Sequence, residues 1–192
     1  MNEEPRLFVA VPLSEPARAA VADVVERIRA SEPEGRGVRW VRLDGLHITL
    51  RFLGPTAESR VDAVAAALAD AAAGITPFEI RVSGADAFPP VGRPRTLWLD
   101  LDRGVDDLAA LAARLDDALA RAGWEREHRP FRAHLTLARA DGVRAGPATV
   151  AALKGAAAEL AIESPIDRIV LFESITGSGR ARYVDRAEVA LG

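Results

Sequence analysis

Two segments of the chain alternate between apolar and polar residues: GLHITLRFLG (45–54) and AHLTLAR (133–139). Successive side chains of a β-strand point to opposite faces, so this alternation predicts a strand with one apolar face in each segment. In both segments a histidine and, two residues later, a threonine share the other face. These residues are His47 with Thr49, and His134 with Thr136. The chain contains three histidines, and two of them stand in this repeated pattern.

The rest of the chain alternates between strand and helix patterns. Further strands are predicted at residues 6–13, 78–88, 96–102, 166–174 and 182–190, and helices at residues 15–30, 57–73, 106–122 and 148–160. Ser14 is placed as the N-cap of the first helix, and Gly74 and Gly123 end the second and third helices. A loop is expected at 31–37 and a turn at 177–179.

The order strand, helix, histidine strand occurs once in each half of the chain. His47 and His134 are 134 − 47 = 87 positions apart, which is roughly half of the 192 residues. The strands and helices together indicate an α+β protein. The spacing of the histidines indicates two related lobes with pseudo-two-fold symmetry. We expect the lobes to share one core within a single domain that spans residues 1–192.

Composition narrows the classes of protein that the chain can form. The residues are 49% apolar and 28% charged, as in ordinary soluble globular proteins. Because there is no cysteine, thiolate zinc sites and cysteine nucleophiles are excluded. The net charge of −3 does not indicate a protein that coats nucleic acid, although arginines gather around the second histidine segment.

The N-terminal sequence and the apolar runs favour a cytoplasmic protein without a membrane segment. The chain starts with MNEEPRL, whose acidic residues differ from the basic start of a signal peptide. The longest alanine-rich run, residues 63–75, contains Asp70 and is too short to cross a bilayer.

The paired motifs resemble those of the two-histidine (2H) phosphoesterase superfamily, which carries His-x-Thr/Ser-hydrophobic in each half of the chain. His-Ile-Thr-Leu (47–50) and His-Leu-Thr-Leu (134–137) match this pattern. Four segments are similar in order and position to the RNA 2′,3′-cyclic phosphodiesterases, also called 2′-5′ RNA ligases or LigT-like proteins: RLFVAVPL (6–13), HITLRFLG (47–54), RPFRAHLTLAR (129–139) and GRARYVDRAEVAL (179–191). The resemblance implies antiparallel-rich sheets with helices packed outside, and an active-site cleft between the two lobes.

The resemblance also implies roles for the repeated residues. His47 and His134 are expected to be the catalytic acid and base, and Thr49 and Thr136 to bind the phosphate. The expected reaction is hydrolysis of a 2′,3′-cyclic phosphate at the end of RNA or on a nucleotide, by a monomer without metal or other cofactor. We expect His47 to protonate the leaving 3′-oxygen and His134 to activate water, which leaves a 2′-phosphate. A 5′-hydroxyl in place of water would give 2′-5′ RNA ligation without ATP.

Five further residues are candidate substrate contacts: Arg51, Phe52, Arg132, Arg139 and Tyr183. Strict alternation places Phe52 opposite His47 and favours the core, so a base-stacking role requires a bulge or bend near Arg51. Arg139 reaches the cleft only if its strand has ended or twisted, and otherwise it is a solvated surface charge. Tyr183 lines the cleft or packs on the core. His128 has no threonine partner and is expected on the surface.

Two other functional classes remain open. One is a phosphodiesterase for small cyclic nucleotides or 2′-5′ oligonucleotides, and the other is a non-catalytic module that binds RNA ends. The sequence has no His-Glu-x-x-His metal motif, no glycine-rich phosphate loop with lysine and no Gly-x-Ser-x-Gly elbow. Both histidines and both threonines are intact, which favours an enzyme.

Overall fold

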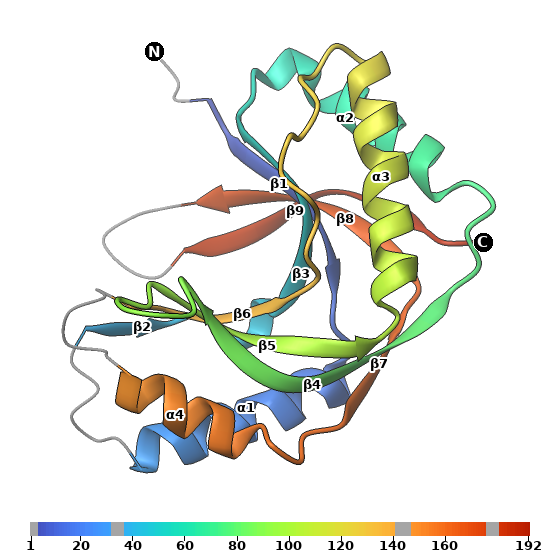
Figure 1. The fold of residues 1–192 in the computed structure, drawn as a ribbon. Coiled ribbons are helices and arrows are strands. Elements are labelled where there is room, and N and C mark those ends of the chain that lie inside the picture. Colours follow the sequence, from blue (N-terminus) through green and yellow to red (C-terminus); the bar gives the residue numbers. More distant parts are fainter. Residues whose placement is uncertain (1–3, 32–36, 141–146, 176–180) are drawn as a thin grey trace.

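A computed structural model describes residues 4–31, 37–140, 147–175 and 181–192. Its strands form two antiparallel sheets (Figure 1). The first sheet has the order β3 (His47–Pro55), β1 (Arg6–Pro12), β8 (Arg168–Ile175), β9 (Arg182–Ala190). The second sheet has the order β2 (Val38–Trp40), β6 (Leu135–Ala140), β5 (Thr96–Arg103), β4 (Phe78–Phe88), β7 (Ile162–Ile166). The predicted α+β class and antiparallel sheets are confirmed.

The predicted strand at 166–174 corresponds to β8, and a further strand directly before it, β7, was not predicted. β7 precedes Asp167 and pairs with β4, whereas β8 follows it and pairs with β1 in the other sheet. Pro165 lies within β7, and proline is tolerated there because β7 is an edge strand. Alternate residues of β7 are buried, so the strand pattern was present but short. The predicted loop at 31–37 lies mostly, and the turn at 177–179 entirely, outside the described residues.

Each sheet is covered by a pair of helices. α2 (Val61–Ala72) and α3 (Val105–Arg121) pack on the first sheet, and α1 (Glu15–Ser31) and α4 (Pro147–Ala156) pack on the second (Figure 1). Thus α1 follows a strand of the first sheet but covers the second sheet. In the same way α3 follows a strand of the second sheet but covers the first. The predicted strand, helix, histidine-strand repeat is present in both halves, with its helices exchanged between the lobes.

One apolar core joins the two sheets. It runs from Val9 and Ile48 of the first sheet to Leu99 and Leu135 of the second, all fully buried. Because the core is continuous and the helices cross over, the relative position of the two histidine strands is set by dense packing.

The start of α1 is tied to the second sheet by polar contacts. Ser14 accepts a hydrogen bond from the amide of Ala17 at 3.4 Å, which confirms it as the N-cap. The amide of Ser14 itself donates to Oγ of Ser164 in β7 at 2.9 Å. Ser164 is fully buried, so this contact holds α1 against an edge strand far away in sequence. Within the described residues, no helix combines the length and the apolar character needed to cross a membrane.

Candidate active site

Both motif histidines stand where a strand begins, and both are held in the same way. His47 is the first residue of β3, and His134 directly precedes β6. Nδ1 of His47 lies 2.7 Å from the carbonyl oxygen of Gly45, and Nδ1 of His134 lies 2.8 Å from that of Arg132. A carbonyl can only accept, so Nδ1 donates in each ring, and Nε2 of the neutral imidazole keeps its lone pair. Both Nε2 atoms are therefore available for proton transfer.

The two histidine strands carry matching β-bulges. In the pairing of β3 with β1, Thr49 and Arg51 lie opposite consecutive residues, so Leu50 is the extra residue. In the pairing of β6 with β5, Leu137 is the extra residue in the same way. Each bulge thus falls three residues after its histidine. A bulge reverses the alternation of faces beyond it.

The bulges decide which later side chains share the histidine face. Phe52 lies on the face of His47 and is 61% exposed, so the core position favoured by strict alternation is wrong. Arg139 lies on the face of Thr136 in the same way, and its exposed guanidinium donates from Nη1 to Oγ1 of Thr96 at 2.5 Å. Each histidine is thereby followed by an exposed side chain suited to a nucleotide, an aromatic ring in one lobe and a cation in the other.

Aromatic rings surround both imidazoles. The ring of His47 lies 4.9 Å from Phe8, 5.1 Å from Tyr183 and 5.8 Å from Phe172, measured between centroids. Phe8 and Phe172 were not predicted as site residues, because only the pairing of β1 with β3 and β8 brings them to the histidine.

The second imidazole has a smaller aromatic surround. The ring of His134 lies 5.4 Å from Phe88 and 5.8 Å from Trp98, neither of which was predicted. Cζ of Arg132 lies 4.4 Å from the centroid of Trp98, and the arginine also pairs with Asp100 at 3.8 Å. Arg132 therefore borders the second histidine but is already held by an aromatic face and a carboxylate.

Burial lowers the pKa of both histidines. For His47 it is the main cause, opposed by the hydrogen bond to the carbonyl of Gly45. For His134 burial is again the largest cause, and the charge of Arg139 lowers the pKa further. Both imidazoles are thus neutral near pH 7 in the absence of an anion.

Arg139 links the two halves of the site. Its charge lowers the pKa of His134, and it also opposes the rise that burial causes in the pKa of Tyr183. Tyr183 belongs to β9 of the first sheet and packs edge-on against His47. The charge of Arg139 therefore acts on groups of both lobes. The strands β3 and β6 are also in contact, so the two histidine centres lie at one junction between the sheets.

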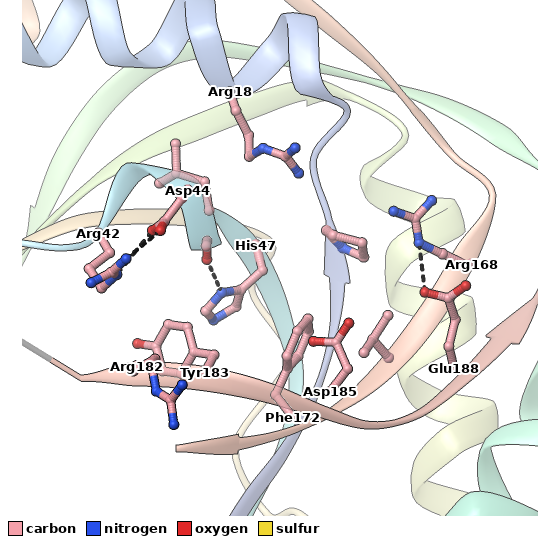
Figure 2. A pocket seen from close by; sticks show the side chains of 14 residues that line it. Arg18, Arg42, Asp44, His47, Arg168, Phe172, Arg182, Tyr183, Asp185 and Glu188 are labelled. Atoms are coloured by element: carbon pink, nitrogen blue, oxygen red, sulfur yellow. Dashed lines mark hydrogen bonds and ion pairs between the residues drawn. The ribbon is translucent and has the colours of Figure 1, made fainter. Parts of the chain in front are cut away.

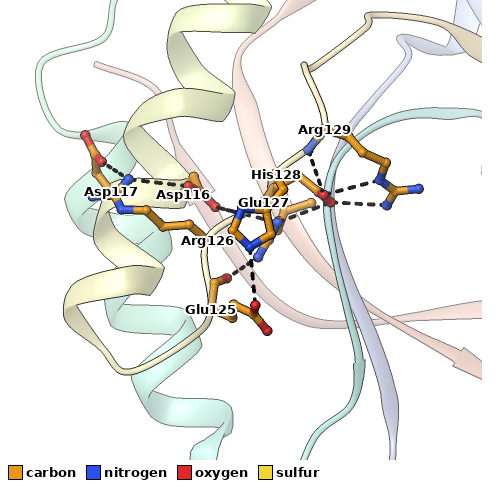
Figure 3. A network of polar contacts seen from close by, with 8 residues as sticks. Asp116, Asp117, Glu125, Arg126, Glu127, His128 and Arg129 are labelled. Atoms are coloured by element: carbon orange, nitrogen blue, oxygen red, sulfur yellow. Dashed lines mark hydrogen bonds and ion pairs between the residues drawn. The ribbon is translucent and has the colours of Figure 1, made fainter.

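Arg51 does not join this site. Its side chain is 10% exposed and pairs with Asp116 at 3.6 Å and Glu127 at 3.2 Å, and Nη2 donates to the carbonyl of Glu125. These partners lie on α3 and on the segment that follows it (Figure 3). The bulge turns Arg51 to the face opposite His47, so the predicted substrate contact is wrong.

The same network contains the third histidine. His128 is 80% exposed, with Nε2 3.3 Å from a carboxylate oxygen of Glu125, which confirms its predicted surface position (Figure 3). Hydrogen bonds from Arg129 lower the pKa of Glu127 to about 2. The network connects the segment before the second motif to α3, and it leaves the motif residues free.

Thr49 and Thr136 are the predicted phosphate ligands. Both are half-buried on the histidine faces. Neither hydroxyl makes a hydrogen bond to another residue in the described ranges. In the same part of the chain, no group of three histidine or acidic side chains is placed to hold a metal ion.

A pocket of about 380 Å³ opens beside His47 (Figure 2). Tyr183 and Phe172 form part of its wall, and several arginines line it. His134 is not among the lining residues. The pocket therefore extends away from the junction, on the side of the first histidine.

Solved structures share this fold over nearly the whole chain, and one of them, a phosphoesterase, superposes with a TM-score of 0.70 and 28% identity, covering 98% of this chain and 99% of that one. The structure of E. coli LigT complexed with 3′-AMP superposes with a TM-score of 0.76 and 26% identity, covering 98% of this chain and 99% of that one. The structure of the Thermus thermophilus protein TT0787 gives a TM-score of 0.75 and 28% identity, with 97% of each chain covered.

Sequence comparison gives the family. Residues 15–177 match the model of the 2′-5′ RNA ligase superfamily. An RNA 2′,3′-cyclic phosphodiesterase of Archaeoglobus fulgidus is 33% identical over 134 residues, which cover 70% of this chain and 72% of the relative. One of Bacillus subtilis is 33% identical over 135 residues, which cover 70% and 71%. The chain belongs to the 2′-5′ RNA ligase superfamily, and the predicted membership is confirmed.

Proposed function

We propose that the protein is an RNA 2′,3′-cyclic phosphodiesterase that acts as a cytoplasmic monomer without a metal ion. The observation that carries this proposal is the pair of matching His-x-Thr motifs, each with Nδ1 of the histidine held by the carbonyl two residues earlier. Two such centres at one junction supply an acid, a base and hydroxyl donors for a single phosphate. Relatives named as RNA 2′,3′-cyclic phosphodiesterases support the same activity.

The proposed reaction is an in-line displacement at phosphorus. Nε2 of His134 removes a proton from water while the water oxygen forms a bond to phosphorus. The bond from phosphorus to the 3′-oxygen breaks, and Nε2 of His47, protonated in the reactive complex, gives its proton to that oxygen. The product carries a 2′-phosphate, and each turnover consumes one water. Thr49 and Thr136 donate their hydroxyls to the non-bridging oxygens as negative charge increases on them.

The position of the pocket supports this assignment of acid and base. The leaving 3′-oxygen stays attached to the ribose, so the nucleoside must lie on the side of the acid, opposite the attacking water. The pocket opens beside His47, and the ring of Phe8 contacts both His47 and Phe52, which share one face of β3. A base stacked on Phe52 thus places the ribose next to His47 and leaves the side of His134 to water.

The lowered pKa values fit a site that is loaded by an anion. Burial keeps both free imidazoles neutral. The negative phosphate favours uptake of one proton, because an opposite charge within a few ångströms stabilises the imidazolium. One acid and one base then coexist as a coupled pair. Arg139 offsets the same negative charge without a metal.

The test is hydrolysis of a short RNA ending in a 2′,3′-cyclic phosphate, in EDTA, by wild type, His47→Ala and His134→Ala. We expect each variant to lose about 10²- to 10⁴-fold in rate, the usual contribution of general acid–base catalysis. His128→Ala removes an exposed histidine and serves as the matched control, with unchanged turnover.

The product and the chelator separate the remaining possibilities. A 2′-phosphate agrees with His47 as the acid, whereas a 3′-phosphate exchanges the two roles. Inhibition by EDTA would contradict the metal-independent mechanism. If wild type hydrolysed neither this RNA, nor a cyclic mononucleotide, nor a 2′-5′-linked dinucleotide, the protein would be a binding module for RNA ends.

A further inference from the structure

The pocket beside His47 contains more cations than the proposed reaction uses. It is bounded by the end of β1, the start of α1, the turn before β3, and strands β8 and β9. Its charged lining residues are Arg18, Arg42, Arg168, Arg182, Asp44, Asp185 and Glu188. Four arginines and three carboxylates give a formal charge of 4 − 3 = +1. We call this cavity the arginine pocket.

Two of its arginines are neutralised within the protein. Arg42 forms a two-point contact with Asp44, at 3.1 Å from Nε and 2.5 Å from Nη2. Nε of Arg168 lies 3.1 Å from a carboxylate oxygen of Glu188 (Figure 2). These pairs shape the rim of the arginine pocket and leave little charge for a ligand.

The other two arginines have no carboxylate partner among the residues that the structure describes. Arg18 is half-buried and reaches from α1 toward the pocket (Figure 2). Nη1 of Arg18 donates to the carbonyl of Leu13 at 2.9 Å, which holds the side chain in place, and its other N–H groups donate to no other described residue. Arg182, at the start of β9, is exposed and lies on the side of the pocket opposite Arg18 (Figure 2). A half-buried guanidinium without a counter-ion is unfavourable unless an anion binds it.

The arginine pocket and Phe52 lie on opposite sides of His47 along the chain of β3. Pocket residues 42 and 44–46 precede the histidine, and Phe52 follows it by five positions on the same face. In a nucleotide the base leaves the ribose at C1′ and the 5′-oxygen at C4′ through C5′, so the two groups diverge from the cyclic phosphate at C2′ and C3′. With the base on Phe52, the 5′-phosphate is directed toward the arginine pocket.

We propose that the arginine pocket binds the 5′-phosphate of the nucleotide that carries the cyclic phosphate, with Arg18 as its ligand. This proposal rests on the proposed function, since it places the cyclic phosphate between the two histidines. It gives the substrate class a physical basis. Every RNA end has a phosphate at that 5′-oxygen, whereas a free nucleoside 2′,3′-cyclic phosphate does not. The enzyme therefore selects RNA ends over free nucleoside cyclic phosphates.

The experiment compares kcat/KM for adenosine 2′,3′-cyclic phosphate with that for 5′-phosphoadenosine 2′,3′-cyclic phosphate. For wild type we expect the 5′-phosphorylated compound to be preferred by about tenfold or more, the effect of one charge-assisted hydrogen bond. In Arg18→Gln this ratio falls toward one. Arg27→Gln is the matched control, because Arg27 is exposed on the same helix as Arg18 and does not line the pocket, and its ratio stays at the wild-type value.

The outcomes separate the two proposals. Turnover of both compounds at equal kcat/KM by wild type would overturn the 5′-phosphate site and leave the proposed function intact. A preference that persists in Arg18→Gln would also overturn it. If wild type hydrolysed neither compound, nor the short RNA with a 2′,3′-cyclic phosphate end, nor a 2′-5′-linked dinucleotide, the proposed function would fail. Calorimetric titration with adenosine 5′-monophosphate would then decide on the pocket, with equal affinity in wild type and Arg18→Gln as the contradicting result. Thermal melts check folding, and Arg18→Lys replaces the glutamine variant if that one unfolds.

Discussion

Replacing Arg139 by glutamine tests the cation that acts on both lobes. The bulge at Leu137 puts Arg139 on the face of Thr136, and Nη1 of Arg139 donates to Oγ1 of Thr96, the one hydrogen bond of its guanidinium to a described side chain. Glutamine removes the charge and most donors but keeps a polar side chain. A hydrogen bond to a charged group contributes about 1.5–3 kcal/mol, so kcat/KM should fall about 10- to 150-fold. Arg139→Lys keeps the charge and should recover part of this loss.

The same variant has a second effect that a purely structural role would not produce. The charge of Arg139 lowers the pKa of His134, so its removal should raise that pKa. The pKa of His47 is lowered by burial, without a contribution from Arg139, and should stay unchanged. Titration of the two imidazoles by NMR in the free protein measures both shifts.

Arg103→Gln provides the control for loss of one positive charge. Arg103 lies at the opposite end of β5 from Thr96, where it pairs with Glu163 at 3.4 Å. The reasoning is refuted if Arg139→Gln loses no more activity than Arg103→Gln, or if His47 and His134 shift equally.

Two further predictions concern Phe52 and the dependence of stability on pH. Phe52→Ala should raise KM about 5- to 150-fold by loss of base stacking, with Phe52→Trp close to wild type; an unchanged KM for the alanine variant would exclude stacking. Because burial lowers the pKa of His47 and His134 below 6.5, the unfolded chain takes up protons first as pH falls. The stabilisation that depends on the two neutral imidazoles should therefore be fully present above pH 6.5. Below this pH the free energy of unfolding should decline. Urea unfolding at pH 7.5 and 5 should show a smaller decline for His47→Gln, and an equal decline would contradict this reading.

Much of the fold could be predicted because its signals are local. Alternating residues mark strands, and Ser14, Gly74 and Gly123 mark helix ends, whatever the rest of the chain does. The repeated His-x-Thr motif is local as well, since two residues separated by one position share a face in any regular strand.

The missed features depend on contacts between distant segments. β7 was missed because it has only five residues, one of them a proline, and its pairing with β4 is not visible in its own sequence. The helices cross between the lobes because of where apolar faces find partners, which no single segment records. Arg51 is removed from the site by Asp116 and Glu127, more than sixty positions later.

The sequence by itself determined that each half carries a histidine and a threonine on one face of a strand, because alternation is a property of the local backbone. Only the tertiary structure decided what surrounds them. Pairing with β1 and β5 places the two bulges and so turns Phe52 and Arg139 toward the histidines. The arginine pocket is assembled from segments between residues 12 and 188. Such features arise from strand pairing and long-range packing, whose partners are chosen by the whole chain at once.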